Sequence, residues 1–302
     1  MEKLITRRDL LKKTAAWAVG SSIFLSRPLE SWALGTKSGK TGKKSKVVLV
    51  RNEKLFGNDN QPNPTIAAQM LDDAICKLTG KRNAKEAWAS IVKPTDIVGI
   101  KTNGWSKFPT PEIVNNLLKD RVLQTGVKPE NVNVKDSGVL DDPVFQKATA
   151  LINVRPMRTH AWAGVGTCIK NYIQFSPNRP SYHDDSCASL AALYELPIVK
   201  GKTRLHILVL FNPLFNHRTA QDVSEEFMWK YNGLLMGFDP VAVDAVGLRI
   251  IQAKRNAFFG EDRPLNPPAK HIELADTRYH LGNADPAKID LIKLGWDSES
   301  FV

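Results

Sequence analysis

Polar side chains follow several apolar segments of the chain at the points where those segments end. In chain order they are Lys101, Asn103, Asp136 and Asn212. The carboxyl ends of parallel strands meet at one edge of a sheet and form a ligand-binding crevice there, so these side chains are expected to converge. Lys101 in such a crevice either grips an anionic ligand, forms a covalent adduct with it, or pairs with Asp136.

A second group of reactive side chains lies between residues 155 and 190. This stretch is rich in Gly, Pro, Ser and Asn and has weak hydrophobic periodicity, which predicts a long irregular segment of the functional kind. Its candidate residues are Arg158, His160, Thr167, Lys170, Asn171 and His183. The two histidines, with carboxylates nearby, either bind a divalent metal, exchange protons, or serve as surface and capping residues. Their spacing matches no standard metal site.

A helix start late in the chain adds two carboxylates. Asp239-Pro240 has the residue types of an N-cap followed by a first-turn proline, and it predicts a helix over residues 240–254. Asp239 either only caps this helix or also belongs to the ligand-binding crevice. Asp244 either faces the crevice or pairs with Arg249.

The elements that must position these residues alternate along the chain. Apolar runs predict buried strands at residues 46–51, 96–101, 131–136 and 205–211. Helical patterns begin at Asn63-Pro64 and at Thr110-Pro111, where Thr110 is the expected N-cap, and they end at Gly80 and Gly126. This alternation predicts an α/β fold: a mostly parallel sheet with helices on both faces and a long irregular functional segment.

The first 33 residues have the features of a twin-arginine (Tat) export signal. Arg7-Arg8 precede an apolar run at residues 14–25, and Ser31-Trp32-Ala33 offers a cleavage site. We expect a signal peptide at 1–33, a Lys/Gly-rich linker at 34–45 and one domain at 46–302, with the Tat translocase as a partner and a bacterial periplasmic location. The alternative is a soluble amphipathic helix. No later apolar run is long enough to span a membrane after cleavage.

Charge and cysteine content exclude some functions. The net charge of +11 falls to +8 without residues 1–33, which hold six Lys/Arg and three Asp/Glu. No nucleic-acid motif accompanies this charge, so nucleic acid is not an expected partner. The three cysteines form no Cys-x-x-Cys, which argues against an iron–sulfur cluster or structural zinc in this chain. Cys168 and Cys187 either form a disulfide or remain buried thiols.

These motifs resemble the DUF362 proteins, a domain family of unassigned function, over most of residues 46–255. The matching positions are Lys101 and Asn103, Arg158-Thr159-His160, Thr167 with Lys170-Asn171, His183, and Asp239-Pro-Val-Ala-Val-Asp244-Ala245. Two positions depart from the family pattern: Arg158 replaces a lysine, and Asn212 stands where an aspartate is usual. Many relatives carry a cysteine-rich ferredoxin-like extension, so the resemblance implies that any redox role here needs a separate partner protein.

A weaker similarity is to the nickel-pincer lactate racemases, over residues 110–134. That resemblance implies a lysine-anchored cofactor near Lys170 and His183. The sequence thus leaves two functions open. One is an exported protein that binds a small anionic ligand, a metal or a cofactor at the strand ends, as an enzyme or otherwise. The other is a non-catalytic binding or assembly partner of an exported redox protein.

The candidate site follows from these patterns. The expected catalytic groups are Lys101, His160, Lys170 and His183, and His160 and His183 are the candidate metal ligands. The expected ligand- or cofactor-binding groups are Asn103, Asp136, Arg158, Thr167, Asn171, Asn212, Asp239 and Asp244.

Overall fold

The computed structural model describes residues 44–302. The expected signal peptide and most of the expected linker lie outside the described residues. Within residues 44–302, no helix combines the length and the apolar character that crossing a membrane requires.

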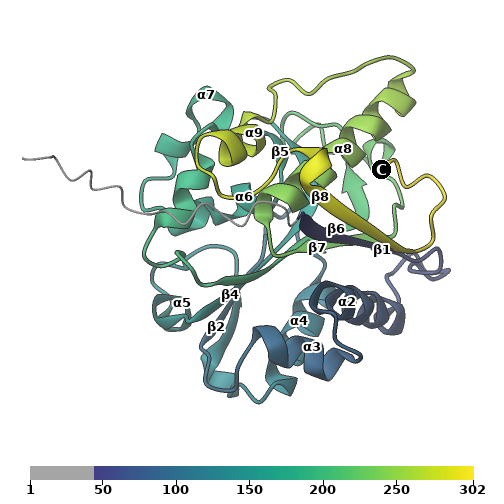
Figure 1. Ribbon diagram of the computed structural model, residues 1–302. Coiled ribbons are helices and arrows are strands. Elements are labelled where there is room, and N and C mark those ends of the chain that lie inside the picture. Colours follow the sequence, from purple (N-terminus) through teal and green to yellow (C-terminus); the bar gives the residue numbers. More distant parts are fainter. Residues whose placement is uncertain (1–43) are drawn as a thin grey trace, which may run out of the picture. The chain divides into compact units, whose positions relative to one another are not determined.

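One mixed sheet runs through the described part of the chain (Figure 1). Its strands are β1 (Ser45–Arg51), β2 (Val98–Lys101), β3 (Val132–Lys135), β4 (Ala150–His160), β5 (Gly164–Gly166), β6 (Thr203–Leu214), β7 (Gly233–Gly237) and β8 (Ile289–Gly295). The order is β3-β2-β4-β6-β7-β1-β8, and β5 pairs with β4. Strands β3, β2, β4 and β6 are parallel neighbours, whereas β7 runs antiparallel to β6 and β1. The carboxyl ends of four strands therefore meet at one edge.

Helices cover both faces of this sheet. They are α2 (Pro64–Thr79), α3 (Ala84–Ile91), α4 (Glu112–Gln124), α5 (Pro143–Lys147), α6 (Cys168–Asn171), α7 (Asp184–Cys187), α8 (Pro240–Phe259) and α9 (Lys270–Thr277). Along β1, Val48 and Val50 pack in the core under α2, α3 and α4, while Val47 and Leu49 pack in the core under α6, α8 and α9 (Figure 1). This alternation is the period of two that a strand buried on both faces requires. The α/β fold class is confirmed.

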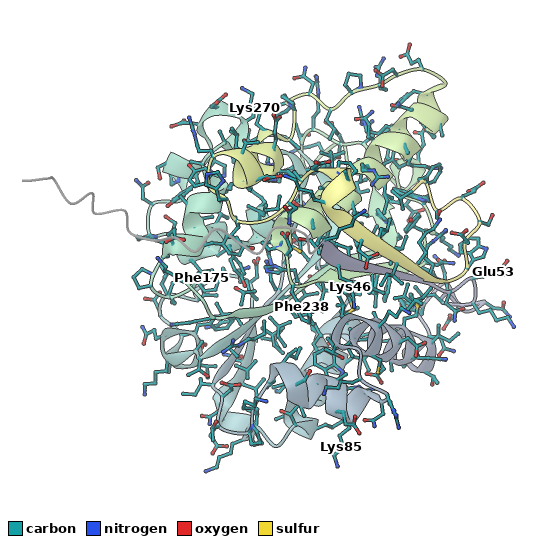
Figure 2. All side chains as sticks on the ribbon, in the orientation of Figure 1. Lys46, Glu53, Lys85, Phe175, Phe238 and Lys270 are labelled. Atoms are coloured by element: carbon teal, nitrogen blue, oxygen red, sulfur yellow. The ribbon has the colours of Figure 1, made fainter. Side chains whose placement is uncertain are left out.

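Side chains are distributed accordingly. Figure 2 shows Lys85 on α3 and Lys270 on α9 at the outside of the fold, and both are exposed. Phe175, by contrast, is 1% exposed and packs against Tyr172 and Phe145. Charged side chains inside the fold are exceptions that need an explanation, and most of them gather near the carboxyl ends of the parallel strands.

Two of the three N-caps that the sequence predicts are present in the structure. Asn63 and Asp239 each accept hydrogen bonds from two backbone N–H groups at the starts of α2 and α8, as expected for N-caps. The prediction that Thr110 caps α4 is wrong. The Thr110 hydroxyl accepts a hydrogen bond from the Asn103 backbone N–H at 3.2 Å, and the residue before the helix is Pro111. Thr110 thus fixes the loop after β2.

The expectation of an irregular segment over residues 155–190 is also corrected. Its beginning belongs to β4, which the sequence did not reveal because Arg155 and Pro156 interrupt an apolar run. The remainder contains β5 and the four-residue helices α6 and α7. Strands β7 and β8 and helices α3 and α9 were not expected either, and α8 extends to Phe259 rather than to Lys254. All three cysteines are free thiols, so Cys168 and Cys187 form no disulfide.

Candidate functional site

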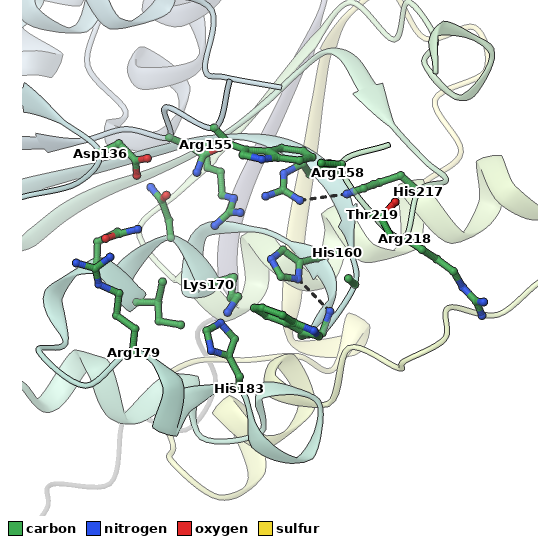
Figure 3. A pocket seen from close by; sticks show the side chains of 18 residues that line it. Asp136, Arg155, Arg158, His160, Lys170, Arg179, His183, His217, Arg218 and Thr219 are labelled. Atoms are coloured by element: carbon green, nitrogen blue, oxygen red, sulfur yellow. Dashed lines mark hydrogen bonds between the residues drawn. The ribbon is translucent and has the colours of Figure 1, made fainter. Parts of the chain in front are cut away.

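A cavity of about 600 Å³ lies where β2, β3, β4 and β6 end (Figure 3). Asn103 enters it from the loop after β2, Asp136 from the residue after β3, and His217 from the loop after β6. The carboxyl half of β4, the short helix α6 and the segments that follow α6 and β6 supply further polar lining. The convergence of strand ends that the sequence predicts is therefore present, at the edge where parallel strands form ligand crevices.

Three side chains from the carboxyl half of β4 line this cavity: Arg155, Arg158 and His160. Arg155 and Arg158 are three residues apart, so a regular strand would point them to opposite faces. The pairing of β4 with β6 is irregular here: between Pro156 and Arg158 its register shifts, and β6 contributes three more residues than β4. The end of β4 therefore departs from regular strand pairing where these side chains meet.

Three cationic side chains in the cavity are buried without full hydrogen bonding. Arg155, Arg158 and Lys170 are 4%, 6% and 2% exposed. The Nε atoms of both arginines and the Nζ atom of Lys170 have no hydrogen-bond partner within residues 44–302. In Figure 3 these three side chains point into the same space. Burying charges without partners is costly, so an arrangement of this kind indicates that another molecule supplies the missing acceptors.

The pKa values in this cluster follow from burial and from mutual repulsion. Burial lowers the pKa of Arg155 to about 10. Burial lowers the pKa of Lys170 to about 8; the positive charge of Arg155 adds to this, and the nearby Cys187 thiol opposes it. Burial and the charge of Arg155 hold the pKa of Arg158 well below its usual value. Lys170 is therefore a cation at neutral pH that can lose its proton at mildly alkaline pH.

Arg158 is held by a small network at the cavity wall. Its Nη1 atom donates to the carbonyl of Thr159 at 3.2 Å and lies 3.3 Å from Nε2 of His217. Since a guanidinium can only donate, Nε2 accepts, and Nδ1–H then donates to the Thr159 hydroxyl at 2.7 Å. The Trp105 ring stacks on both Arg158 and His217. Burial lowers the pKa of His217 to about 4, so this ring is neutral.

His160 is neutral as well. Burial and the charge of Arg158 lower its pKa far below the usual value, and its Nδ1 accepts a hydrogen bond from the Trp162 backbone N–H at 3.2 Å. The proton of the neutral ring is then on Nε2, which can donate to a ligand. The Trp162 indole is 58% exposed and lies 6.2 Å from the His160 ring and 4.5 Å from the His183 ring, centroid to centroid.

Lys101 and Asp136 are the ion pair that the sequence offered as one of three alternatives. Lys101 is fully buried, and its Nζ donates to Oδ1 of Asp136 at 2.8 Å, to the carbonyl of Thr102 at 2.6 Å and to Oδ1 of Asn171 at 3.4 Å. These contacts use all three donors of the ammonium group. Asp136 is partly exposed and lines the cavity, whereas Lys101 is buried and does not line it.

Thr167, Asn171 and Asp244 hold α6, and with it Lys170, in place. Asp244 accepts hydrogen bonds from the Thr167 hydroxyl and from the backbone N–H groups of Cys168 and Ile169, at 2.6–2.9 Å. It neither lines the cavity nor pairs with Arg249, contrary to both expectations. Burial raises the pKa of Asp244 to about 7. The Asn171 amide donates to Asn153 and to two backbone carbonyls of β2 and β4.

Two further candidate residues do not line the cavity. Asp239 caps α8 and accepts hydrogen bonds from the Ser45 hydroxyl and the Asn283 backbone. Asn212 lies within β6, half-buried. The cavity lining, however, includes residues that the sequence reasoning missed: Trp105, Arg155, Trp162, Arg179, His217 and Arg218. The signal for Arg155 was a charged residue followed by proline within an apolar run, which is unusual unless the charge has a role.

The donor set does not fit a bare divalent cation. No cluster of three or more His, Cys, Asp or Glu side chains suited to a metal ion occurs within the part of the chain that the structure describes. The cavity holds the two candidate ligands His160 and His183, but it also holds Arg155, Arg158 and Lys170, whose charges repel a cation. The electrostatics favour an anion.

Comparison with known proteins adds one finding. No curated protein and no solved structure matches the chain. A family model described as a domain of unknown function, DUF362, matches residues 100–249, from the end of β2 to the middle of α8. All of the cavity-lining residues named above lie in this range. The match covers just under half of the chain and supports the resemblance to the DUF362 family.

Proposed function

We propose that the cavity binds a small organic molecule through a phosphate group. The observation that carries the proposal is the cluster of three buried cations, Arg155, Arg158 and Lys170, which line one cavity and each have an unpartnered nitrogen atom within the described residues. The acidic side chain in the cavity lining, Asp136, is neutralised by Lys101. An incoming anion therefore meets a net positive charge and donors that are already in place.

Phosphate suits this charge better than a single carboxylate. A phosphate monoester carries a charge of about −2 near neutral pH and has three strong acceptor oxygens. Guanidinium groups bind such oxygens in bidentate geometry, and hydrogen bonds to charged groups contribute about 1.5–3 kcal/mol each. The exposed Arg179 and Arg218 at the cavity rim extend the positive field toward solvent and favour rapid association.

Lys170 is the group best suited to proton transfer if the bound molecule reacts. Its pKa of about 8 lies near physiological pH, as a general acid or base requires, and the residue lines the cavity. His160 would contribute a neutral Nε2–H donor to an oxygen of the ligand. Lys101 would act indirectly, by holding Asp136 and Asn171 in position.

The binding proposal is tested by calorimetric titration of the purified protein with methyl phosphate at pH 7 and low salt. We expect saturable binding at one site, and a loss of at least tenfold in affinity for Arg155→Met. Arg204→Met is the matched control, because Arg204 is exposed on β6 and lines none of the cavities described here. Absence of binding, or equal weakening by the two variants, would contradict the proposal.

We also propose that the protein is exported through the Tat pathway before it acts. The support is in the sequence: Arg7-Arg8, the short apolar run and the small residues before Leu34. Replacement of Arg7 and Arg8 by lysine should leave the protein in the cytoplasmic fraction of a bacterial host, whereas the wild-type chain appears in the periplasm. Equal export of both chains would rule out this route.

A further inference from the structure

A second cavity, of about 720 Å³, adjoins the phosphate cavity. His160, His217 and Arg218 line both cavities, so the two spaces meet at these three side chains. Figure 3 shows the three on the side of the first cavity that lies away from Asp136. The combined site is therefore longer than a phosphate group needs.

The second cavity differs from the first in chemistry. Its charged groups are mostly satisfied within the protein. Asp222 accepts from the Thr219 backbone N–H, Glu261 pairs with Arg263, and Asp262 accepts from the Asn256 amide. Arg255 donates to the carbonyls of Phe215 and Arg263 and to Asn216.

Beside these charged groups the second cavity offers apolar surface. The apolar side chains that line it are Phe227, Phe259, Pro264 and Leu265. Apolar surface of this kind is stabilised when the carbon skeleton of a ligand covers it. The two cavities therefore differ in their charges: the first holds cations with unpartnered nitrogen atoms, and the second holds charges that mostly have partners within the protein.

Two of the three side chains at the junction, His160 and His217, are neutral and fixed in orientation. His217 is held by the Thr159 hydroxyl and by Arg158, and His160 by the Trp162 backbone. Both rings have lowered pKa values and carry no charge at neutral pH. They can flank an uncharged segment without adding repulsion, and Nε2–H of His160 is available to an ester or hydroxyl oxygen.

We infer that the natural ligand is an elongated organic phosphate whose phosphate group lies among Arg155, Arg158 and Lys170 and whose uncharged carbon-containing portion passes His160 and His217 into the second cavity. This inference rests on the proposed function and specifies its ligand class. Cavities of 300–1,000 Å³ commonly hold whole organic ligands, in agreement with a molecule that extends beyond its phosphate.

The test is a chain-length series: methyl, butyl and hexyl phosphate, each titrated calorimetrically against the purified protein. Affinity should rise by about fourfold for each methylene that becomes buried in the second cavity. Leu265→Asn should reduce this gain and leave the affinity for methyl phosphate unchanged. The control is Leu123→Asn, since Leu123 is a half-buried leucine of α4 that lines neither cavity; it should preserve the gain.

The outcomes separate the two proposals. Equal affinities for the three esters in the wild-type protein would overturn the inference and leave phosphate binding intact. Failure of all three esters to bind would overturn the proposed function itself. A gain that persists in Leu265→Asn would place the alkyl chain elsewhere and also overturn the inference. If Leu265→Asn does not fold, Phe259→Asn tests the same wall of the second cavity.

Discussion

Lys101 and Lys170 are both buried lysines near the same cavity, yet their surroundings are opposite. Lys101 is 0% exposed and donates three hydrogen bonds, one of them to a carboxylate. Lys170 is 2% exposed, and its ammonium nitrogen has no hydrogen-bond partner among the residues described. Burial lowers the pKa of both to about 8. For Lys101 the partner Asp136 opposes this effect, and for Lys170 the positive charge of Arg155 adds to it.

The difference teaches how to separate a structural charge from a ligand-binding one. A buried cation with a complete set of acceptors stabilises the chain around it, and removing its partner leaves an uncompensated buried charge. A buried cation without acceptors is a cost in the free protein that a bound anion can offset. Lys101 therefore supports the site, and we propose that Lys170 is part of its binding surface.

The largest effect is expected on stability, from Asp136→Ala. This change leaves Lys101 buried without its carboxylate and should lower the free energy of unfolding by about 3–5 kcal/mol. Lys170→Met should change it by no more than about 1 kcal/mol, or raise it, because an unpaired buried charge is removed. Urea denaturation measures both. Similar losses for the two variants would contradict the distinction between the two lysines.

The next largest effect is on ligand affinity, from Lys170→Met. Loss of a charge-assisted hydrogen bond of about 1.5–3 kcal/mol should weaken methyl phosphate binding by about 10- to 100-fold. Calorimetry at pH 7 measures this. Lys147→Met on α5 removes an equal charge from an exposed position outside the cavity and should leave affinity nearly unchanged. A comparable loss in this control would mean that overall charge, rather than the site, governs binding.

A pH titration sharpens the comparison further. Only the protonated amine of Lys170 attracts an anion, so methyl phosphate affinity should fall as the pH rises through about 8, toward the affinity of Lys170→Met. That variant should show a smaller step. Lys101 titrates in the same range, and loss of its proton leaves the Asp136 carboxylate in the cavity lining without its counterion, so a residual fall in affinity is expected from this pair. A step of equal size in Lys170→Met would assign the pH dependence to a group other than Lys170.

The same pKa gives a stability effect with a defined sign. The folded protein loses the Lys170 proton near pH 8, whereas the unfolded chain keeps it up to about 10.5. Between these values the unfolded state binds more protons, so stability rises with pH. The rise should be smaller in Lys170→Met, where Lys101 alone remains to cause it. Denaturation series at pH 8 and pH 10 provide the measurement, and identical rises would contradict the lowered pKa of Lys170.

The smallest effect is expected from Trp105→Leu. The Arg158 guanidinium lies 4.2 Å from the centroid of the Trp105 ring, a cation–π contact that contributes about 0.5–1 kcal/mol at exposed sites. Its loss should loosen Arg158 and weaken methyl phosphate binding by about two- to fivefold. Trp296→Leu removes the same kind of contact from Arg51, away from the cavity, and should leave affinity unchanged. An equal loss of methyl phosphate affinity in the two variants would mean that Trp105 has no specific role in binding.

The edge of the sheet that carries the site could be predicted from the sequence, because parallel strands bring their carboxyl ends together. Asn103 and Asp136 therefore lie where they were expected. The roles of Lys101 and Lys170 could not be separated in the same way. Lys101 has hydrogen-bond acceptors and Lys170 has none among the described residues. The side-chain acceptors of Lys101 are 35 or more residues away in the chain, such as Asp136, so no local sequence pattern predicts them.

Arg155 and Asp244 show two other limits of sequence reasoning. Arg155 and Arg158 line the same cavity although they are three residues apart, and strict alternation along a strand does not anticipate this arrangement. Asp244 meets the start of α6 across more than 70 residues of sequence, so its role in holding Lys170 emerges only from tertiary packing. The sequence predicted features that depend on the hydrophobic periodicity of one element or on the position where one strand ends. It did not predict contacts between segments that are distant in the chain.

The most direct measurement is a crystal structure of the protein grown with tungstate, a phosphate-like oxyanion that anomalous scattering locates without ambiguity. The account predicts one ordered tungstate within hydrogen-bond distance of Arg155, Arg158 and Lys170, and none beside Lys101. An empty cavity with tungstate bound elsewhere on the protein would contradict the central claim that these unpartnered cations form an anion site.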